Sequence, residues 1–185
     1  MTKENKKDPK SLMDPLTASG YILFDQDFDS DTVKPAIIKI KMLNLLPKDK
    51  QPKRILIDIN SPGGIIWSLN HLLQTMKESK IPVDTHTSGL AASCGCLLLM
   101  HGQRRTATKY ADIMSHQFSW GAEGKEHELM GKQKAIKLGS KRMIDMYKKT
   151  TGKSELYIRK HLLGPTDVWL TASEAKKHGI IDAIK

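Results

Sequence analysis

The chain has 185 residues, a hydrophobic content of 39% and a formal net charge of +10 at pH 7. This length fits one domain with a sizeable core, and the hydrophobic content excludes a chain that is disordered throughout. No apolar run approaches the roughly 20 residues that a membrane span needs. Residues 1–10 are Lys-rich and polar with no apolar stretch after them, which excludes a secretory signal and predicts a cytoplasmic protein without a membrane partner.

Two further features of the composition limit the expected partners and cofactors. Much of the excess positive charge lies in residues 125–160, but no zinc finger, helix-turn-helix or aromatic-interleaved basic motif accompanies it. We therefore expect a solvated lysine-rich face and no nucleic-acid partner. Cys94 and Cys96 are too close in sequence for a favourable disulfide and too few for a zinc site. We expect two small buried thiols and no metal.

Strand and helix patterns alternate through the first half of the chain. Residues 1–19 show no hydrophobic periodicity, so we expect a flexible N-terminal arm ahead of a single domain at residues 20–185. Pro35 fits the first turn of the first helix, after cap-type residues at 29–31. The elements predicted here are a strand at 21–24, a helix ending at Pro47, a strand at 54–60, a turn at 61–64, a helix at 66–76 and a strand at 82–87.

The second half repeats this alternation and adds one long amphipathic helix. Leu129, Ile136, Met143 and Tyr147 lie seven or four residues apart on that helix and form one apolar stripe. The elements predicted here are a buried helix at 92–101, strands at 104–107 and 113–116, a Gly-containing extended segment at 118–124, the long helix at about 125–149, shorter helices at 154–162 and 171–179, and a strand at 180–184. Alternating strands and helices predict the α/β fold class.

Residues 90–95 have the features of a turn that exposes a nucleophile. Small residues flank Ser93, which follows one apolar stretch and begins another, as at a strand-to-helix turn. The Gly63-Gly64 turn closes an earlier strand and can supply a free backbone N–H to the same point. A serine nucleophile also needs a general base, and the base needs an orienting acid.

The base and the acid are less clearly marked than the nucleophile. Spacing alone does not choose among the seven histidines, although His116 ends an apolar strand and precedes a Gly-bearing loop, where functional residues collect. Asp145, Asp167 and Asp182 are the candidate acids downstream. Asp167 lies between a Gly-Pro helix break and an apolar stretch that we expect to be buried, so its carboxylate would be held in orientation. Asp145 lies on the Lys-rich helix, where we expect it to be solvated.

Four stretches of the chain match one known family together. They are residues 59–64 (INSPGG), 89–95 (GLAASCG), 114–117 (MSHQ) and 167–175 (DVWLTASEA), the last followed by GIID at 179–182. The order Ser, His, Asp differs from the orders of α/β-hydrolases, chymotrypsin and subtilisin. With these stretches and this order, residues 20–185 resemble the ClpP-type ATP-dependent serine peptidases, which enclose their own active sites.

The resemblance implies both a fold and a site. The fold is a crotonase-like spiral of ββα units from which the helix at about 125–149 protrudes as a handle. In the implied site, Ser93 is the nucleophile, His116 the base and Asp167 the orienting acid. The backbone N–H groups of Gly64 and Cys94 form the oxyanion hole. The extended segment pairs with the substrate backbone, and its substrate-binding residues are Phe118, Ser119, Trp120 and Gly121.

The resemblance also implies an assembly. Chains of this family associate into heptameric rings, and two rings stack as a tetradecamer through the apolar stripe of the handle. An AAA+ unfoldase of the Clp ATPase type uses ATP to feed unfolded polypeptides into the chamber, so this chain itself needs no cofactor. The implied function is that of a serine endopeptidase acting by acyl-enzyme chemistry.

Several departures from the family pattern accompany this resemblance. The family's N-terminal Gly-Glu-Arg motif is not recognisable in residues 1–19, Thr166 stands where an Arg commonly precedes the acid, and Phe118 stands where Pro commonly follows His-Gln. They indicate a divergent member, from a phage or a secondary paralogue. The alternatives are a phage head-maturation protease with the same triad, a structural ring subunit of a mixed Clp assembly, and a crotonase-fold acyl-CoA enzyme. The complete triad disfavours the last two.

Overall fold

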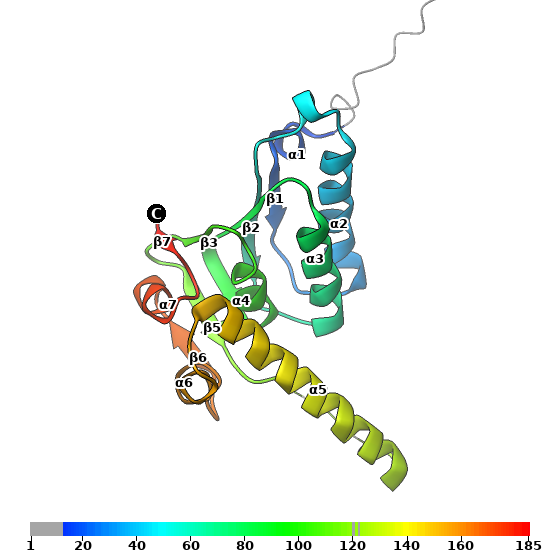
Figure 1. Cartoon of the computed structure of the whole chain (residues 1–185), viewed down its shortest axis with the longest axis vertical. Helices are drawn as coiled ribbons and strands as arrows, with labels where there is room; N and C mark the ends of the chain where they lie inside the picture. Colours follow the sequence, from blue (N-terminus) through cyan, green and yellow to red (C-terminus); the bar gives the residue numbers. More distant parts are fainter. Residues whose placement is uncertain (1–12, 120, 122) are drawn as a thin grey trace, which may run out of the picture.

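A largely parallel sheet forms the centre of the molecule (Figure 1). The computed structural model describes residues 13–119, 121 and 123–185. The strands are β1 (Tyr21–Phe24), β2 (Ile55–Ser61), β3 (Val83–Ala92), β4 (Arg105–Ala107), β5 (Asp112–Ser115), β6 (Val168–Leu170) and β7 (Ala183–Ile184). The order β1-β2-β3-β4-β7 is parallel throughout, while β5 pairs in parallel with β3 and antiparallel with β6. The predicted α/β class is confirmed.

Strand β3 is the point at which the sheet divides. Its first part pairs with β4 and its last part, from Leu90 to Ala92, pairs with β5. β3 is longer than the predicted strand at 82–87 because its second half has small residues, which give no strand pattern in the sequence but pair with β2 and β5. The division places the end of β3 beside the end of β5, directly before Ser93 and His116.

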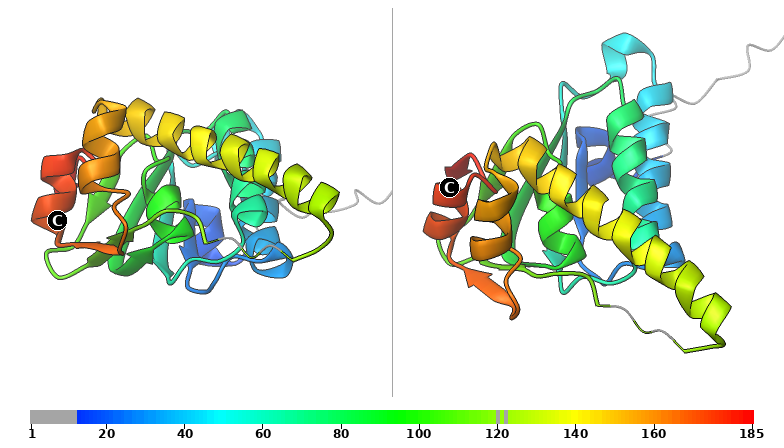
Figure 2. Two further views of the ribbon diagram at one scale, coloured as in Figure 1. Left: turned by 90° about the horizontal axis from the view of Figure 1, so that it is seen from below. Right: turned by 60° about the horizontal axis from the view of Figure 1, so that its bottom comes forward.

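Helices cover the sheet and one of them projects well beyond it. They are α1 (Pro15–Ser19), α2 (Ser30–Leu45), α3 (Ile66–Glu78), α4 (Cys94–Leu99), α5 (Glu126–Thr151), α6 (Glu155–His161) and α7 (Ala172–His178). Helices α2 and α3 lie side by side against the sheet, whereas the first turns of α5 stand away from the rest of the molecule (Figures 1 and 2). The predicted protruding helix is therefore present and slightly longer than expected.

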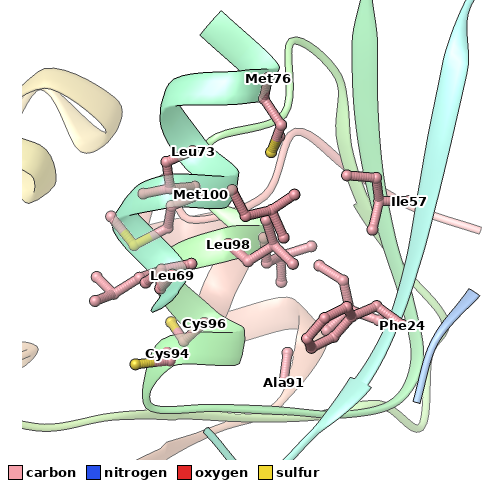
Figure 3. Packing of buried hydrophobic residues seen from close by; sticks show 14 of the residues in the cluster. Phe24, Ile57, Leu69, Leu73, Met76, Ala91, Cys94, Cys96, Leu98 and Met100 are labelled. Atoms are coloured by element: carbon pink, nitrogen blue, oxygen red, sulfur yellow. The ribbon is translucent and has the colours of Figure 1, made fainter. Parts of the chain in front are cut away.

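The buried core lies between the sheet and helices α2, α3 and α4. Every second residue of β2 is buried, and α4 is buried along its whole length, with Cys94 and Cys96 as free thiols, as predicted. Figure 3 shows side chains of α3 meeting those of α4, with Phe24 and Ile57 of the sheet beside them. This packing fixes the start of α4 relative to the end of β2.

The apolar stripe of α5 lies in two different environments. The prediction that the whole stripe forms an interface between rings is therefore corrected. Met143 and Tyr147 are buried in the core of the chain itself, so they are not available to a second ring. Leu129 and Ile136, nearer the start of the helix, remain partly exposed. The spacing of the apolar residues continues along the whole helix, but only the apolar side chains in the first part of α5 remain outside the core.

The N-terminal predictions also need correction. The arm expected at 1–19 includes helix α1, because the Asp14 side chain caps it through the N–H of Thr17 at 2.8 Å and Gly20 ends it with φ of 91°. The rest of the predicted arm, up to residue 12, lies outside the described residues. Pro35 lies inside α2 and not in its first turn, since the Asp29 capping box starts the helix at Ser30.

The stretch that follows Asp167 also differs from expectation. It forms β6, whose middle residue Trp169 is 59% exposed, although Leu170 is buried. Among the described residues β6 pairs with β5 alone, so it is an edge strand. Pairing with β5, and not complete burial, therefore holds the residues after Asp167 in position.

Candidate active site

Ser93 lies at a sharp turn between β3 and α4. Its φ of 54° makes it the one residue other than glycine with positive φ among the described residues. Such backbone strain persists only where the surrounding structure enforces it, and it is typical of nucleophile turns. Here the Ser93 N–H donates to the Met114 carbonyl of β5 at 2.9 Å, which ties the turn to the neighbouring strand.

His116 follows β5 and lies between Ser93 and Asp167. Its Nε2 is 2.7 Å from the Ser93 Oγ, and its Nδ1 is 3.3 Å from the Asp167 Oδ1. The antiparallel register explains this arrangement, because Ser115 pairs with Val168 and the next residues along are His116 and Asp167. The structure thus brings together the three residues that the sequence predicted as nucleophile, base and acid.

The other two candidate acids lie elsewhere. Asp145 is exposed on α5, where its Oδ2 is 2.9 Å from the Lys141 Nζ. Asp182 forms an ion pair with Arg105 at the far edge of the sheet. Burial alone would raise the pKa of Asp182, but the hydrogen bonds from Arg105 outweigh this and lower it. Neither carboxylate has a contact with His116.

The Gly63-Gly64 turn lies directly against the nucleophile. Both glycines have positive φ, and a Cβ on Gly63 would lie 2.6 Å from the Ser93 Cβ. A Cβ on Gly64 would lie 2.5 Å from the carbonyl oxygen of Phe28, whose own backbone bonds hold the turn on both sides. Side chains at these two positions would therefore displace the turn from Ser93.

Gly64 and Cys94, whose backbone N–H groups the resemblance implies as the oxyanion hole, are joined by a hydrogen bond. The Cys94 Sγ donates to the Gly64 carbonyl at 3.1 Å, which joins the glycine turn to the start of α4. Within the described part of the chain, neither the Gly64 N–H nor the Cys94 N–H donates to a protein acceptor. Both remain available to a developing oxyanion.

The cysteines have a structural part in this site. Burial raises the pKa of the Cys94 thiol to about 11 and that of Cys96 to about 12. Both thiols are protonated at neutral pH, so Cys94 is suited to donate a hydrogen bond and unsuited to attack a carbonyl. Among the described residues, no cluster of three or more His, Cys, Asp or Glu side chains could hold a metal ion.

A cavity of about 440 Å³ opens beside Ser93 and His116. Its remaining lining is mainly apolar and comes from the Gly-Gly turn, α3, α4, α5 and the segment after His116: Gly64, Ile65, Ile66, Trp67, Cys94, Leu97, Phe118, Ser119, Gly121, Met143 and Tyr147. Phe118, Ser119 and Gly121 were predicted to bind substrate, whereas Trp120 lies outside the described residues. Six other lining residues were not predicted from the sequence: Ile65, Ile66, Trp67, Leu97, Met143 and Tyr147. The position of Ile66 just after the Gly-Gly turn is the sequence signal that could have identified it as a lining residue.

The segment at 118–124 differs from its predicted extended, strand-like role in one respect. Its described residues belong to no strand of the sheet. Of these described residues, Phe118, Ser119 and Gly121 line the cavity beside His116. Whether it pairs with a substrate stays a prediction.

Comparison with known proteins gives the family. A family model described as Clp protease matches residues 4–185. The chain is also 36% identical over 157 residues to "ATP-dependent Clp protease proteolytic subunit 1" of Chlamydia abortus (strain DSM 27085 / S26/3), which covers 83% of this chain and 81% of that protein. The chain belongs to the Clp protease family. Its resemblance to ClpP-type peptidases is confirmed, and so is the corresponding fold with a handle helix.

Membership of the Clp protease family makes the chain a peptidase and a proteolytic subunit. Within the part of the chain that the structure describes, no helix is long and apolar enough to cross a membrane. The family match begins at residue 4, so it includes most of the segment that the sequence analysis separated as an arm.

Proposed function

We propose that this chain is a serine endopeptidase that cleaves unfolded polypeptides through an acyl-enzyme formed on Ser93. The observation that supports this most directly is the continuous chain from the Ser93 Oγ through the His116 ring to the Asp167 carboxylate. Ser93 acts as the nucleophile, His116 as the general base and Asp167 as the acid that orients the base, and the distance of each contact suits that role.

The reaction begins when the Ser93 Oγ attacks the scissile carbonyl carbon and its proton passes to the His116 Nε2. The Asp167 Oδ1, 3.3 Å from the His116 Nδ1, lies where its charge favours the tautomer with the proton on Nδ1, which leaves Nε2 free as a base. The N–H groups of Gly64 and Cys94 stabilise the negative charge on the tetrahedral intermediate. His116 then protonates the leaving amine, and a water molecule activated by the same ring hydrolyses the acyl-enzyme.

The cavity beside Ser93 accepts an apolar side chain of the substrate. Burying such a side chain against Ile66, Leu97 and Met143 stabilises the complex by the ordinary hydrophobic effect. The segment containing Phe118, Ser119, Trp120 and Gly121 pairs with the extended substrate backbone and fixes its direction relative to Ser93.

In the proposed assembly, chains form heptameric rings that stack through the projecting half of α5 into a tetradecamer. A Clp-type AAA+ unfoldase supplies unfolded polypeptide and consumes ATP, and this chain carries no cofactor. The site of action is the cytoplasm. The family membership and the exposed apolar residues near the start of α5 support this assembly.

A fluorophosphonate probe tests the chemistry, because it labels only an activated serine. We expect labelling of the wild-type protein at Ser93 and none of Ser93→Ala, with the same native mass for both proteins. Ser93→Ala should also remove hydrolysis of a short fluorogenic peptide. Equal hydrolysis by the two proteins would rule out the serine mechanism. An unlabelled wild type of full ring mass would instead favour a structural ring subunit.

A further inference from the structure

The residues on both sides of His116 are fastened to the same turn. Ser115, which is 1% exposed, donates its hydroxyl hydrogen to the Leu162 carbonyl at 2.5 Å. Gln117 Nε2 donates to the carbonyls of Leu163 and Gly164 at 2.9 and 3.1 Å. This turn leads directly to Asp167. The strand that presents the base and the segment that presents the acid are therefore connected by side chains as well as by strand pairing.

A third element joins this connection through the buried end of α5. The Tyr147 Oη lies 2.6 Å from the Ser115 Oγ, and both residues are buried. Since the single hydroxyl hydrogen of Ser115 goes to Leu162, the Tyr147 hydroxyl must be the donor to Ser115. Burial raises the pKa of Tyr147 well above its ordinary value, so the phenol keeps its proton at neutral pH.

Strand β5 is paired on both sides, but both ladders stop before His116. The ladder with β3 ends at Met114. The β5–β6 ladder has three residue pairs and ends at Ser115 and Val168, one residue before the catalytic pair. Asp167 itself is more than half exposed. A short ladder frays most easily at its end, and a small displacement of the base from its acid or nucleophile is costly for turnover.

We propose that Ser115 and Tyr147 are positioning residues, which hold His116 in line with Ser93 and Asp167 by joining β5 to α5 and to the turn after α6. This proposal rests on the peptidase function proposed above. Neither side chain contacts the Ser93 Oγ or the Asp167 carboxylate, so both act through His116. The ring of Tyr147 also lines the cavity beside Ser93, whereas its hydroxyl bonds to Ser115.

Two variants remove hydrogen bonds that join β5 to α5 and to the turn after α6, and a third variant is a control matched to them in burial and bonding. Ser115→Ala removes the central hydroxyl, and Tyr147→Phe removes only the donor while the ring still lines the cavity. Thr85→Val is the control, because Thr85 is equally buried and its hydroxyl also donates to a carbonyl, that of Leu99 at 2.6 Å, away from the site. Ser115→Thr restores a hydroxyl at position 115.

The readout is peptide hydrolysis, separated into kcat and KM. For Ser115→Ala we expect kcat to fall about 10- to 100-fold, with a smaller fall for Tyr147→Phe. KM should stay within about twofold of wild type for both, because the cavity is retained. Thr85→Val should lose thermal stability without loss of kcat, and Ser115→Thr should recover part of the lost rate.

A second comparison separates positioning from general destabilisation. If Ser115 acts through the His116–Asp167 pair, Ser115→Ala should reduce kcat much less in an Asp167→Asn background than in wild type. Equal losses in the two backgrounds, or a kcat for Ser115→Ala equal to that of Thr85→Val, would overturn the proposal. If Ser115→Ala does not fold, Tyr147→Phe takes its place. Its kcat is then compared with that of Thr85→Val, and its loss in wild type is compared with its loss in the Asp167→Asn background. A wild type without peptidase activity or fluorophosphonate labelling would instead remove the proposed function itself.

Discussion

The two halves of α5 have the same sequence periodicity and opposite surroundings. Near its end, Met143, Ile144 and Tyr147 are buried in the core, and Tyr147 reaches the residue beside His116. In its first half, Met130 is 67% exposed and Leu138, at the middle of the helix, 48% exposed. The first turns of α5 stand away from the rest of the fold (Figure 2). The buried half belongs to the candidate active site, whereas the projecting half offers an apolar surface suited to another chain. In the function and assembly proposed above, one helix would support the active site at one end and association at the other.

The strongest test concerns the site that the buried half supports, and it compares Asp167 with Asp145, an exposed carboxylate on that half of α5. Asp167→Asn should lower kcat about 10⁴-fold, because an amide favours the wrong His116 tautomer and cannot stabilise the imidazolium. Asp145→Asn should leave kcat near wild type, since Asp145 is exposed and forms an ion pair with Lys141 on its own helix. Hydrolysis of a fluorogenic peptide measures both. If Asp145→Asn gave the larger loss, the acid would be misassigned and the exposed side of the buried half of α5 would take part in the chemistry.

The second test measures stability. Tyr147→Ala should lower the free energy of unfolding by about 3–5 kcal/mol, because it leaves a cavity in the core and removes the bond to Ser115. Leu138→Ala should change it by about 0.5 kcal/mol or less, since Leu138 is half exposed on the projecting half. Denaturant unfolding of the two variants, in the same oligomeric state by sedimentation, gives the comparison. Similar losses would show that the projecting half is also packed in solution.

Local patterns in the sequence were sufficient for the parts of the site that depend on a few neighbouring residues. The Gly-Gly turn and the small residues around Ser93 are such parts, because only small side chains allow the turn to approach the nucleophile. The alternation of apolar residues in β2 likewise identified a buried strand. These features require no knowledge of which segments meet in space.

Other features depend on long-range pairing, which no local pattern reveals. Asp167 meets His116 because β6 pairs antiparallel with β5, and the sequence marks β6 with only three residues. The apolar stripe of α5 gave no sign of where the core ends, so Met143 and Tyr147 were assigned to a ring interface. The N-cap at Asp14 was missed because a helix of five residues has too few positions for periodicity.

The third test adds a charge to the projecting half. Ile136→Lys should shift the assembly toward single rings or monomers, because a buried lysine on an apolar contact is unfavourable by roughly 1–3 kcal/mol. Peptidase activity should fall with the loss of assembly, since α5 also supports His116 through Tyr147. Native mass spectrometry and peptide hydrolysis measure the two effects on the same samples.

A matched control for this charge lies at the preceding position. Ala135→Lys adds the same charge about 100° around the helix, on an exposed position outside the apolar groove that Leu129, Met130 and Ile136 form. It should leave the assembly close to wild type. An equal effect of both variants would mean that charge alone, and not the apolar surface, governs association. A monomeric wild type with full activity would break the link between assembly and catalysis.

The smallest expected effect concerns salt. The projecting half carries Lys134 and Lys137, both exposed, and facing helices in a stacked pair of rings would bring such like charges together. Salt screens charges beyond a Debye length of roughly 8 Å near physiological ionic strength, so moderate salt should strengthen assembly. Lys134→Glu should flatten this dependence, because it removes one repulsion and adds a possible attraction. Sedimentation across a salt series measures both proteins. Assembly that weakens as salt is added would show that attraction between charges, and not the apolar surface at the start of α5, holds the rings together.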